Sequence, residues 1–242
     1  MAPPSSRSAA APAPLPTGAE KTARVRSMFD AIAPRYDLVN RLMTFGLDQQ
    51  WRRATVTALA LPAGSRVLDL ACGTGDLSLL AARAGLGVVG ADLSAGMLAA
   101  NRRATALVQA DCSRLPFADG TFDGLLCGYA LRNFTDLDVA FVEMARVLRP
   151  GGRVAILEVD APTSPTLRAG YRIWFEKVVP LLGSALSDRE AYHYLPRSVA
   201  YLPAAPGLRR LLAGAGFSTV GIRPLAGGLS QLLTATRAGA PA

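Results

Sequence analysis

The stretch from Asp69 to Ser78 has the residue types and spacing of a nucleotide-binding turn. Val67–Leu70 is a short run rich in apolar residues, typical of a parallel strand that helices cover on both faces. Gly73 and Gly75 follow it directly and precede a predicted helix. The spacing Gly73-x-Gly75-x-x-Ser78 lacks the third glycine of the dinucleotide fingerprint. The turn is therefore expected to bind a nucleotide other than a dinucleotide.

The charges beside the turn indicate which nucleotide that is. Asp69 ends the strand and Asp76 follows the turn, so a pyrophosphate lying on the helix N-terminus would be repelled. S-adenosylmethionine has no phosphate. Its sulfonium and ammonium groups would be attracted by Asp69, and its carboxylate would be received by the backbone around Gly73, Thr74 and Gly75. We therefore predict an S-adenosylmethionine site at this turn.

A second acid follows at the distance expected for a ribose ligand. Val88–Asp92 is predicted as the next strand, and Asp92 lies 92 − 69 = 23 residues beyond Asp69. A carboxylate there accepts hydrogen bonds from both ribose hydroxyls. Ser94 is predicted to cap a short helix that carries Met97 into the same site.

A third strand, Ala106–Asp111, also ends in an acid. The Asp111 carboxylate is expected to accept the adenine amino group, and the backbone N–H of Cys112 to reach a ring nitrogen. Such acids also end strands simply as turn residues. Taken together, however, three acids around one glycine turn are the pattern of a class I S-adenosylmethionine-dependent methyltransferase. The expected fold is α/β and Rossmann-like, with a seven-stranded, mostly parallel sheet and an antiparallel edge strand.

The rest of the chain is assigned around this core. The remaining strands are predicted at 122–127, 153–159, 216–222 and 230–236, with helices at 137–148 and 208–215. Residues 1–19 and 238–242 are predicted to be disordered tails. Residues 20–237 are predicted to form a single methyltransferase domain with N-terminal helices at 20–61 and a helical insertion at 160–205. An apolar stripe in this insertion is consistent with either core packing or a lid over an apolar substrate, and its members are Leu167, Tyr171, Trp174, Phe175, Val178, Leu181 and Leu182.

Composition narrows the possible partners. The 242 residues include 26 basic and 18 acidic side chains, a net charge of +8, and much of the excess lies near the two ends. No run of five consecutive basic residues occurs, so nucleic acid is not an expected partner. An anionic membrane surface explains the spread-out charge equally well, and so does a GC-rich coding bias that favours arginine. Three cysteines without Cys-x-x-Cys spacing and one histidine, His193, predict neither a metal site nor a disulfide framework.

The segment before the first strand resembles a known family. Tyr36-Asp37, Asn40, Gly46 and Trp51 are similar to the N-terminal signature of the ubiquinone/menaquinone-biosynthesis C-methyltransferases, and the resemblance runs from about residue 20 to 237. Its second signature is matched by Arg146–Gly152 with Glu158. The departures are Val39 for the usual Met, Thr44 for Ser, Asp48 for His and Gly128 for Ser.

The resemblance implies C-methylation of a prenylated quinol by S-adenosylmethionine. Demethylmenaquinol is the expected substrate, because the composition is typical of GC-rich bacteria that respire through menaquinone. The prenylated methoxybenzoquinol of ubiquinone biosynthesis remains an alternative. Two other classes of protein are alternatives. A nicotinamide-dependent oxidoreductase is disfavoured by the Asp69 carboxylate and by Ser78 in place of the third glycine. An RNA methyltransferase is suggested only by the positive net charge.

Three residues are expected to carry the chemistry. Methyl transfer to a ring carbon needs the quinol as a phenolate, although a phenol has a pKa of about 10. Arg132 is expected to stabilise that anion, Asn133 to orient the ring oxygen, and Tyr36 is the next candidate. The alternative for Arg132 is a salt bridge to Asp136 or Asp138. His193 is as well explained by packing as by catalysis.

The predicted location follows from the substrate. No charge-free run reaches the length of about 18 apolar residues that a membrane span needs, and prolines break the N-terminal Ala/Pro stretch too often for a signal peptide. A cytoplasmic enzyme that contacts the inner face of the plasma membrane is therefore expected. The oligomeric state stays open.

Overall fold

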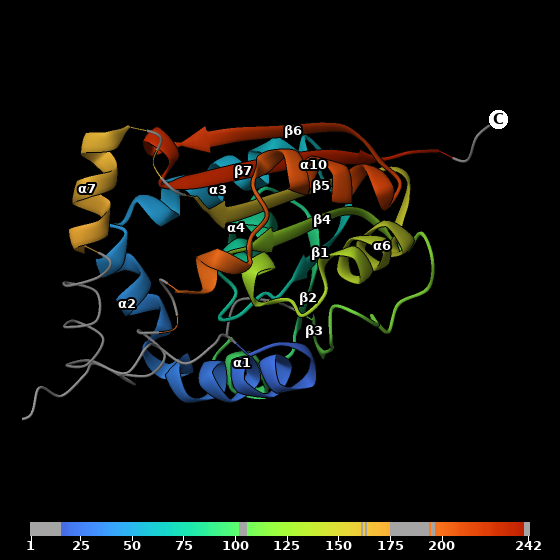
Figure 1. The fold of residues 1–242 in the computed structure, drawn as a ribbon. Coiled ribbons are helices and arrows are strands. Elements are labelled where there is room, and N and C mark those ends of the chain that lie inside the picture. The colour runs from blue at the N-terminus through green and yellow to red at the C-terminus, as the bar shows by residue number, and fades with distance from the viewer. Residues whose placement is uncertain are drawn as a thin grey trace, which may run out of the picture.

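The computed structural model describes residues 16–101, 106–160, 162, 164–174, 194 and 197–239, and it contains one seven-stranded sheet (Figure 1). The strand order is β3-β2-β1-β4-β5-β7-β6. Parallel pairing links β3 to β2, β2 to β1, β1 to β4 and β4 to β5. The strands are β1 (Arg66–Leu70), β2 (Gly87–Asp92), β3 (Ala106–Gln109), β4 (Phe122–Gly128), β5 (Leu148–Val159), β6 (Phe217–Leu225) and β7 (Ser230–Arg237).

The antiparallel strand lies one position inside the predicted edge. β7 pairs antiparallel with both β5 and β6, so β6 forms the edge of the sheet. The burial of the two strands follows from these positions. Most of β7 is buried, whereas β6 is largely exposed or half-buried, because only the interior strand has a neighbour on both sides.

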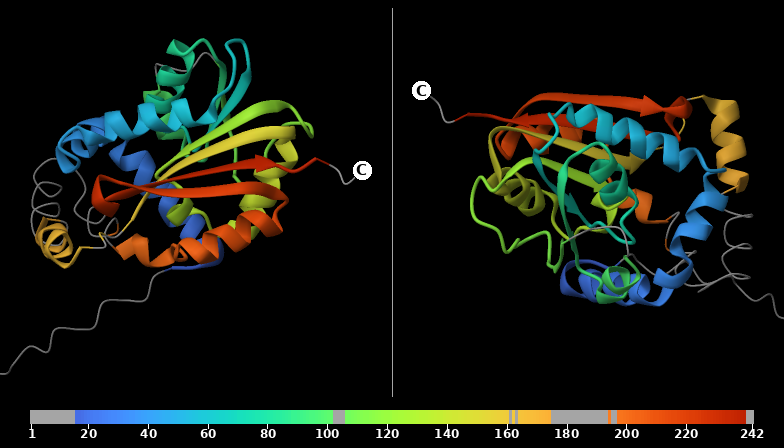
Figure 2. Two further views of the ribbon diagram at one scale, coloured as in Figure 1. Left: turned by 90° about the horizontal axis from the view of Figure 1, so that it is seen from above. Right: turned by 180° about the vertical axis from the view of Figure 1, so that it is seen from behind.

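Helices cover both faces of the sheet (Figure 2). α3 (Leu47–Leu59) and α4 (Asp76–Arg83) lie on one face, and α6 (Leu137–Val147) and α10 (Ala205–Gly214) lie on the other. Because successive strand residues point to opposite faces, Val67 belongs to the cluster with α3 and α4, while Leu68 and Leu70 belong to the cluster with α6. Both faces are therefore packed, as the apolar run in β1 predicted.

The N-terminal helices lie beyond the sheet, near the carboxyl ends of β1 and β2. α1 (Gly18–Ile32) is followed by the 3-10 turn η1 (Ala33–Arg35) and by α2 (Tyr36–Met43). A small core joins Ile32 and Val39 to Met97 of α5 (Ala95–Ala100). α1 begins at Gly18, so residues 18–19 belong to a helix and not to the predicted tail. Residues 1–15 lie outside the described residues.

Several predicted boundaries shift. β3 ends at Gln109, two residues before the predicted end, and Asp111 forms an isolated bridge with Arg114 instead. β5 begins at Leu148, because the strand already pairs there with Phe122. Within the predicted insertion the structure has α7 (Pro165–Ile173) and the 3-10 turn η4 (Val199–Tyr201), whereas Phe175, Val178, Leu181, Leu182 and His193 lie outside the described residues.

Across the described ranges, none of the helices is both long enough and apolar enough to cross a bilayer.

Candidate active site

The glycine turn between β1 and α4 has the backbone geometry that only glycine adopts easily. Gly73 and Gly75 have φ values of 53° and 89°, in the left-handed region. A Cβ on Gly75 would lie 2.5 Å from Oδ1 of Asn101. Asn101 is tied to the same turn, since its Nδ2 donates to the Gly73 carbonyl over 3.0 Å. A side chain at position 75 would therefore strain the turn and displace its support.

Asp92, at the end of β2, holds this turn in place. One carboxylate oxygen accepts the N–H of Gly73 and the other accepts the N–H of Ser94, each over 2.8 Å. Burial raises the pKa of Asp92, while these hydrogen bonds oppose the rise. Asp92 thus links the first two strand ends and presents its carboxylate to the adjoining cavity.

This cavity lies between the strand ends and α1. Seven of the predicted site residues line it, namely Tyr36, Gly73, Asp92, Met97, Asp111, Cys112 and Asn133. One Asp111 oxygen accepts the N–H and hydroxyl of Ser113 in a tight turn. The sequence did not predict the opposite wall, which α1 supplies through Thr22, Val25, Arg26 and Phe29. The amphipathic pattern of α1 was visible, but nothing in the sequence said which element its apolar face would meet.

Asp69 does not reach this cavity wall. Strand alternation points its side chain to the same face as Val67, beneath α4, where the Ser78 hydroxyl donates to it over 2.5 Å. The carboxyl is fully buried, and its second oxygen has no hydrogen-bond partner among the described residues. Burial raises the pKa of Asp69 to about 7, although the Ser78 hydrogen bond opposes this rise. The Asp69 side chain therefore lies behind the cavity wall, and the attraction predicted between its carboxylate and a cationic cofactor stays a prediction.

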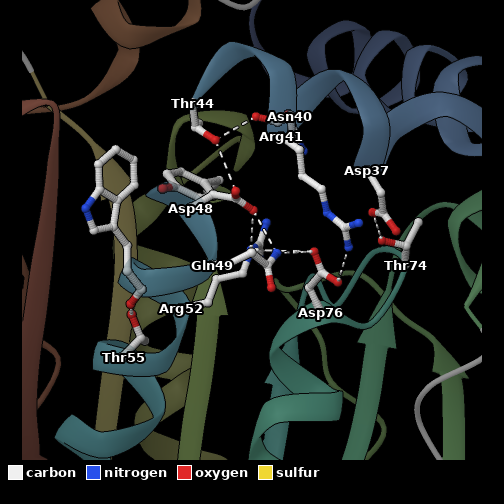
Figure 3. Close-up of polar contacts among 12 residues, drawn as sticks. Asp37, Asn40, Arg41, Thr44, Asp48, Gln49, Arg52, Thr55, Thr74 and Asp76 are labelled. Atoms are coloured by element: carbon white, nitrogen blue, oxygen red, sulfur yellow. Dashed lines mark hydrogen bonds and ion pairs between the residues drawn. The ribbon is translucent and has the colours of Figure 1, made fainter. Parts of the chain in front are cut away.

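Thr74 and Gly75 also stand back from the cavity wall. The Thr74 hydroxyl donates to Asp37 at the start of α2. This bond ties the glycine turn to the N-terminal helices (Figure 3). The contact predicted between the backbone N–H groups of these two residues and the cofactor stays a prediction.

A buried polar network extends from the turn into α3 (Figure 3). Asp48, in place of the family histidine, is almost fully buried and accepts Thr44 Oγ1 and Gln49 Nε2 over 3.0 Å each. Arg52 Nε lies 3.4 Å from Asp48 and 3.8 Å from Asp76. Asp48 thus holds the Arg52 cation, whereas a histidine at this position would at most carry a positive charge of its own. The network fixes α3 against the first turn of α4.

Arg132 is buried behind the cavity in the 3-10 turn η2 (Leu131–Asn133). Its Nη1 pairs with Glu158 and donates to the Tyr129 carbonyl over 2.8 Å. The salt-bridge partner of Arg132 is thus Glu158, which belongs to the second family signature, and not Asp136 or Asp138. Burial alone would lower the pKa of Arg132, but the Glu158 carboxylate raises it. Its Nε is buried without a hydrogen-bond partner among the described residues.

Asn133 and Tyr36 are nearer the open space. Both line the cavity, and Tyr36 also packs edge-on against Phe29 at 5.9 Å between ring centroids. Tyr194, which the sequence analysis missed, donates its hydroxyl to Asn133 Oδ1 over 3.4 Å. Burial raises the pKa of Tyr194 to about 12, so this hydroxyl stays protonated near neutral pH. No sequence motif connects Tyr194 to this site, since it lies 61 residues after Asn133 in the chain.

Two contacts dock α1 over the cavity. Asp30 Oδ1 accepts the Ser94 hydroxyl over 2.5 Å and the Gly96 N–H over 2.8 Å. At the other end of the helix, Lys21 Nζ donates to the Phe134 carbonyl over 2.6 Å. Burial lowers the pKa of Lys21 to about 8. α1 is therefore attached at both ends of the wall that it forms.

Comparison with known proteins decides the family. Residues 17–237 match the model of the ubiE/COQ5 methyltransferase family. The chain belongs to this family. It is 44% identical over 222 residues to a ubiquinone/menaquinone biosynthesis C-methyltransferase of Syntrophotalea carbinolica, covering 88% of this chain and 93% of that one. It is 47% identical over 201 residues to a demethylmenaquinone methyltransferase of Thermus thermophilus, covering 79% and 91%.

Solved structures agree on the fold. A putative methyltransferase of Haloferax volcanii, in complex with the activator Trm112, has a TM-score of 0.63 and 19% identity, covering 87% of this chain and 98% of that one. A Haemonchus contortus phosphoethanolamine N-methyltransferase bound to S-adenosylhomocysteine has a TM-score of 0.63 and 17% identity, covering 89% and 60%. The class I methyltransferase fold is thereby confirmed. As a member of the ubiE/COQ5 family, this chain is an S-adenosylmethionine-dependent C-methyltransferase.

Proposed function

We propose that this enzyme converts demethylmenaquinol to menaquinol by methylating a ring carbon. The observation that carries the proposal is a single cavity that brings the predicted cofactor ligands Asp92 and Asp111 together with Tyr36 and Asn133. The names of the relatives in Thermus thermophilus and Syntrophotalea carbinolica support a quinone-pathway substrate.

The residues present fit S-adenosylmethionine. Asp92 keeps unused lone pairs on both oxygens for the ribose hydroxyls, because a carboxylate has about four acceptor sites and two are occupied. Asp111 and the Cys112 N–H would hold the adenine, and Met97 would pack against it. The glycine turn would receive the carboxylate of the methionyl part. Asp69 would act on the cationic part through its charge.

The sulfonium, when bound, supplies the electrophilic methyl group. The quinol oxyanion would make the adjacent ring carbon electron-rich, so that this carbon could take the methyl group with its own electron pair. The carbon–sulfur bond would break with its electrons left on sulfur, giving S-adenosylhomocysteine, and loss of the ring proton to solvent would restore the aromatic ring. Arg132 would stabilise the oxyanion from behind the cavity wall, and Asn133 would orient the ring oxygen. Tyr36 lines the same cavity. Alignment of the carbon with the methyl group would supply much of the acceleration.

The test supplies labelled S-adenosylmethionine with demethylmenaquinol and, separately, with the demethylated precursor of ubiquinol. Label in the naphthoquinol alone is the expected result. Label in the benzoquinol alone would replace the proposed substrate with the second candidate. Label in neither pool would overturn the quinol proposal.

We further propose that the enzyme works at the inner face of the plasma membrane. A polyprenyl quinol resides in the bilayer, so the site must reach it there. The net charge of +8 favours an anionic surface.

A further inference from the structure

An exposed apolar edge runs along α2 and the turn after it. Leu38, Leu42 and Phe45 are 53%, 43% and 73% exposed. Leu38 and Leu42 lie one helical turn apart, and Phe45 continues the edge into the turn. We call these three residues the α2 patch. Large exposed apolar side chains also occur elsewhere in the described chain, but only here do three fall within eight residues.

Phe45 is held in its exposed position by the fold. Its φ of 53° lies in the left-handed region, which is unfavourable for an aromatic residue. Its ring centroid is 4.5 Å from that of Trp174, and Trp174 Nε1 donates to the Met43 carbonyl over 3.0 Å. The ring therefore stays outward at a cost in backbone energy, although an apolar group in water gains nothing from such a position.

The charges around the α2 patch are mainly basic. Arg35 precedes the helix and Arg41 lies within it. Both are exposed, although Arg41 Nη2 also lies 3.9 Å from Asp76 Oδ1. The one acid of α2, Asp37, accepts the Thr74 hydroxyl and is drawn toward the glycine turn. Apolar side chains flanked by arginines are the pattern of a helix that lies in the interface of an anionic bilayer.

The same helix reaches the cavity. Tyr36 begins α2 and lines the cavity, while Leu38 lies two residues further along and points to solvent. One short element therefore connects the site that would hold the quinol ring with the exposed apolar edge. A long apolar tail leaving the cavity beside Tyr36 would meet the α2 patch next.

We propose that the α2 patch inserts into an anionic lipid bilayer and receives the prenyl chain of the substrate there. The second half of this statement rests on the proposed quinol substrate, whereas the first half does not. Membrane contact is thus assigned to one face of the molecule, in addition to the general attraction of its positive charge.

The test compares two double variants of the full chain. Leu42→Ser with Phe45→Ser removes apolar surface from the patch without changing charge. Val139→Ser with Val142→Ser is the matched control, because these side chains are 43% and 55% exposed on α6, on the opposite side of the molecule from α2 (Figure 1). Binding is measured by cosedimentation with vesicles of phosphatidylcholine and phosphatidylglycerol that contain no quinol.

We expect the patch variant to lose about tenfold or more in vesicle partitioning, since two inserted side chains are removed. The control should stay within about twofold of the parent by the same accounting. Unchanged affinity for S-adenosylhomocysteine in both variants would show that the fold is retained. Equal partitioning of the patch variant and the parent would overturn the proposal. So would a patch variant that changes only the oligomeric state in light scattering, because the patch would then be a self-association surface.

A second measurement separates this proposal from the quinol proposal. Methylation of a detergent-dispersed demethylnaphthoquinol with a short side chain should be unchanged in the patch variant, while methylation of the long-chain quinol in vesicles should fall. Loss of vesicle binding by the patch variant, together with a parent that methylates no quinol at all, would support membrane insertion of the α2 patch and overturn only the proposed substrate. If the patch variant methylates the vesicle-bound quinol at the parental rate, the α2 patch does not receive the prenyl chain.

Discussion

We predict that Asp69 makes cofactor binding depend on pH, in a direction that its burial determines. Because its folded pKa of about 7 lies above the unfolded value of about 3.9, the neutral form is favoured in the folded protein. Its contribution to stability is therefore complete below the unfolded pKa and is lost as pH rises through about 7. A bound sulfonium would favour the ionised form and lower this pKa.

We therefore predict that affinity for S-adenosylmethionine rises about tenfold between pH of about 6 and about 8, relative to that for S-adenosylhomocysteine, which lacks the sulfonium. Calorimetric titration of both ligands measures the ratio. Asp69→Asn keeps the shape of the side chain and should abolish the excess pH dependence. The same ratio at both pH values in the parent would remove Asp69 from cofactor recognition.

We expect the carboxylate of Asp92 to bind the cofactor with the same atoms that hold the glycine turn. Asp92→Ala should lower S-adenosylhomocysteine affinity at least about tenfold, because it removes two charge-assisted hydrogen bonds of roughly 1.5–3 kcal/mol each, less what water restores. It also releases the N–H groups of Gly73 and Ser94. Asp92→Asn, measured alongside, keeps acceptor capacity on one oxygen and should lose less. Binding by Asp92→Ala within about twofold of the parent would exclude Asp92 from the site.

The Arg132–Glu158 pair makes a simple truncation of Arg132 ambiguous. Arg132→Ala alone would leave Glu158 buried without its cation, at a cost of about 3–5 kcal/mol. We therefore choose Arg132→Met with Glu158→Gln, which removes both charges together. This variant should keep its fold and its S-adenosylhomocysteine affinity, while kcat falls by about tenfold or more through loss of the oxyanion stabiliser.

Chemical unfolding and ligand titration check the first two properties, and turnover checks the third. The conservative Arg132→Lys keeps the charge but loses the planar arrangement of donors, so it should also turn over slowly. If both variants turn over at the parental rate, Arg132 is structural, and Tyr36→Phe is the next variant to measure.

Among the elements that form the site, α1 is the one that a single substitution should loosen most easily. It forms one wall of the cavity, and Asp30 and Lys21 dock its two ends. Burial would raise the pKa of Asp30, but the bonds from Ser94 and Gly96 lower it overall. This docking is therefore fully present above the unfolded pKa of about 3.9 and is lost as pH falls through the lower folded value.

Asp30→Ala should loosen α1 without unfolding the sheet. We expect the amides of α1 to exchange faster with solvent, and S-adenosylhomocysteine to dissociate several-fold faster. Hydrogen exchange and stopped-flow measurements record the two effects. Asp138→Ala, an exposed acid on α6, is the matched control and should change neither. Parental dissociation from Asp30→Ala would mean that α1 does not retain the cofactor.

For the molecule as a whole, charge and apolar surface make separable contributions to membrane contact. The net charge of +8 predicts that vesicle binding weakens as salt is added, because screening shortens the reach of each arginine to about 10 Å at 0.1 M ionic strength. Cosedimentation with vesicles of increasing phosphatidylglycerol content, at low and high salt, measures this. Binding that ignores both variables would defeat the electrostatic part, while the α2 patch is tested by its own variants.

The local sequence determined the core of the fold and much of the cavity lining. Strand runs, the glycine turn and the acids at the carboxyl ends of β1 and β2 are encoded within a few residues of one another, and parallel strands necessarily bring their carboxyl ends to one edge. Gly73, Asp92, Met97, Asp111 and Cys112 were accordingly predicted, and all line the cavity. The family signature also followed from short segments.

Only the tertiary structure decided which side chains face the cavity and what partners they have. Asp69 turns beneath α4 because strand alternation, not sequence proximity to the turn, sets its direction. Glu158, Tyr194 and the α1 wall come from distant parts of the chain, so their contacts depend on packing that no local pattern records. For the same reason β7, and not β6, lies next to β5: the order of the strands is a property of the assembled sheet.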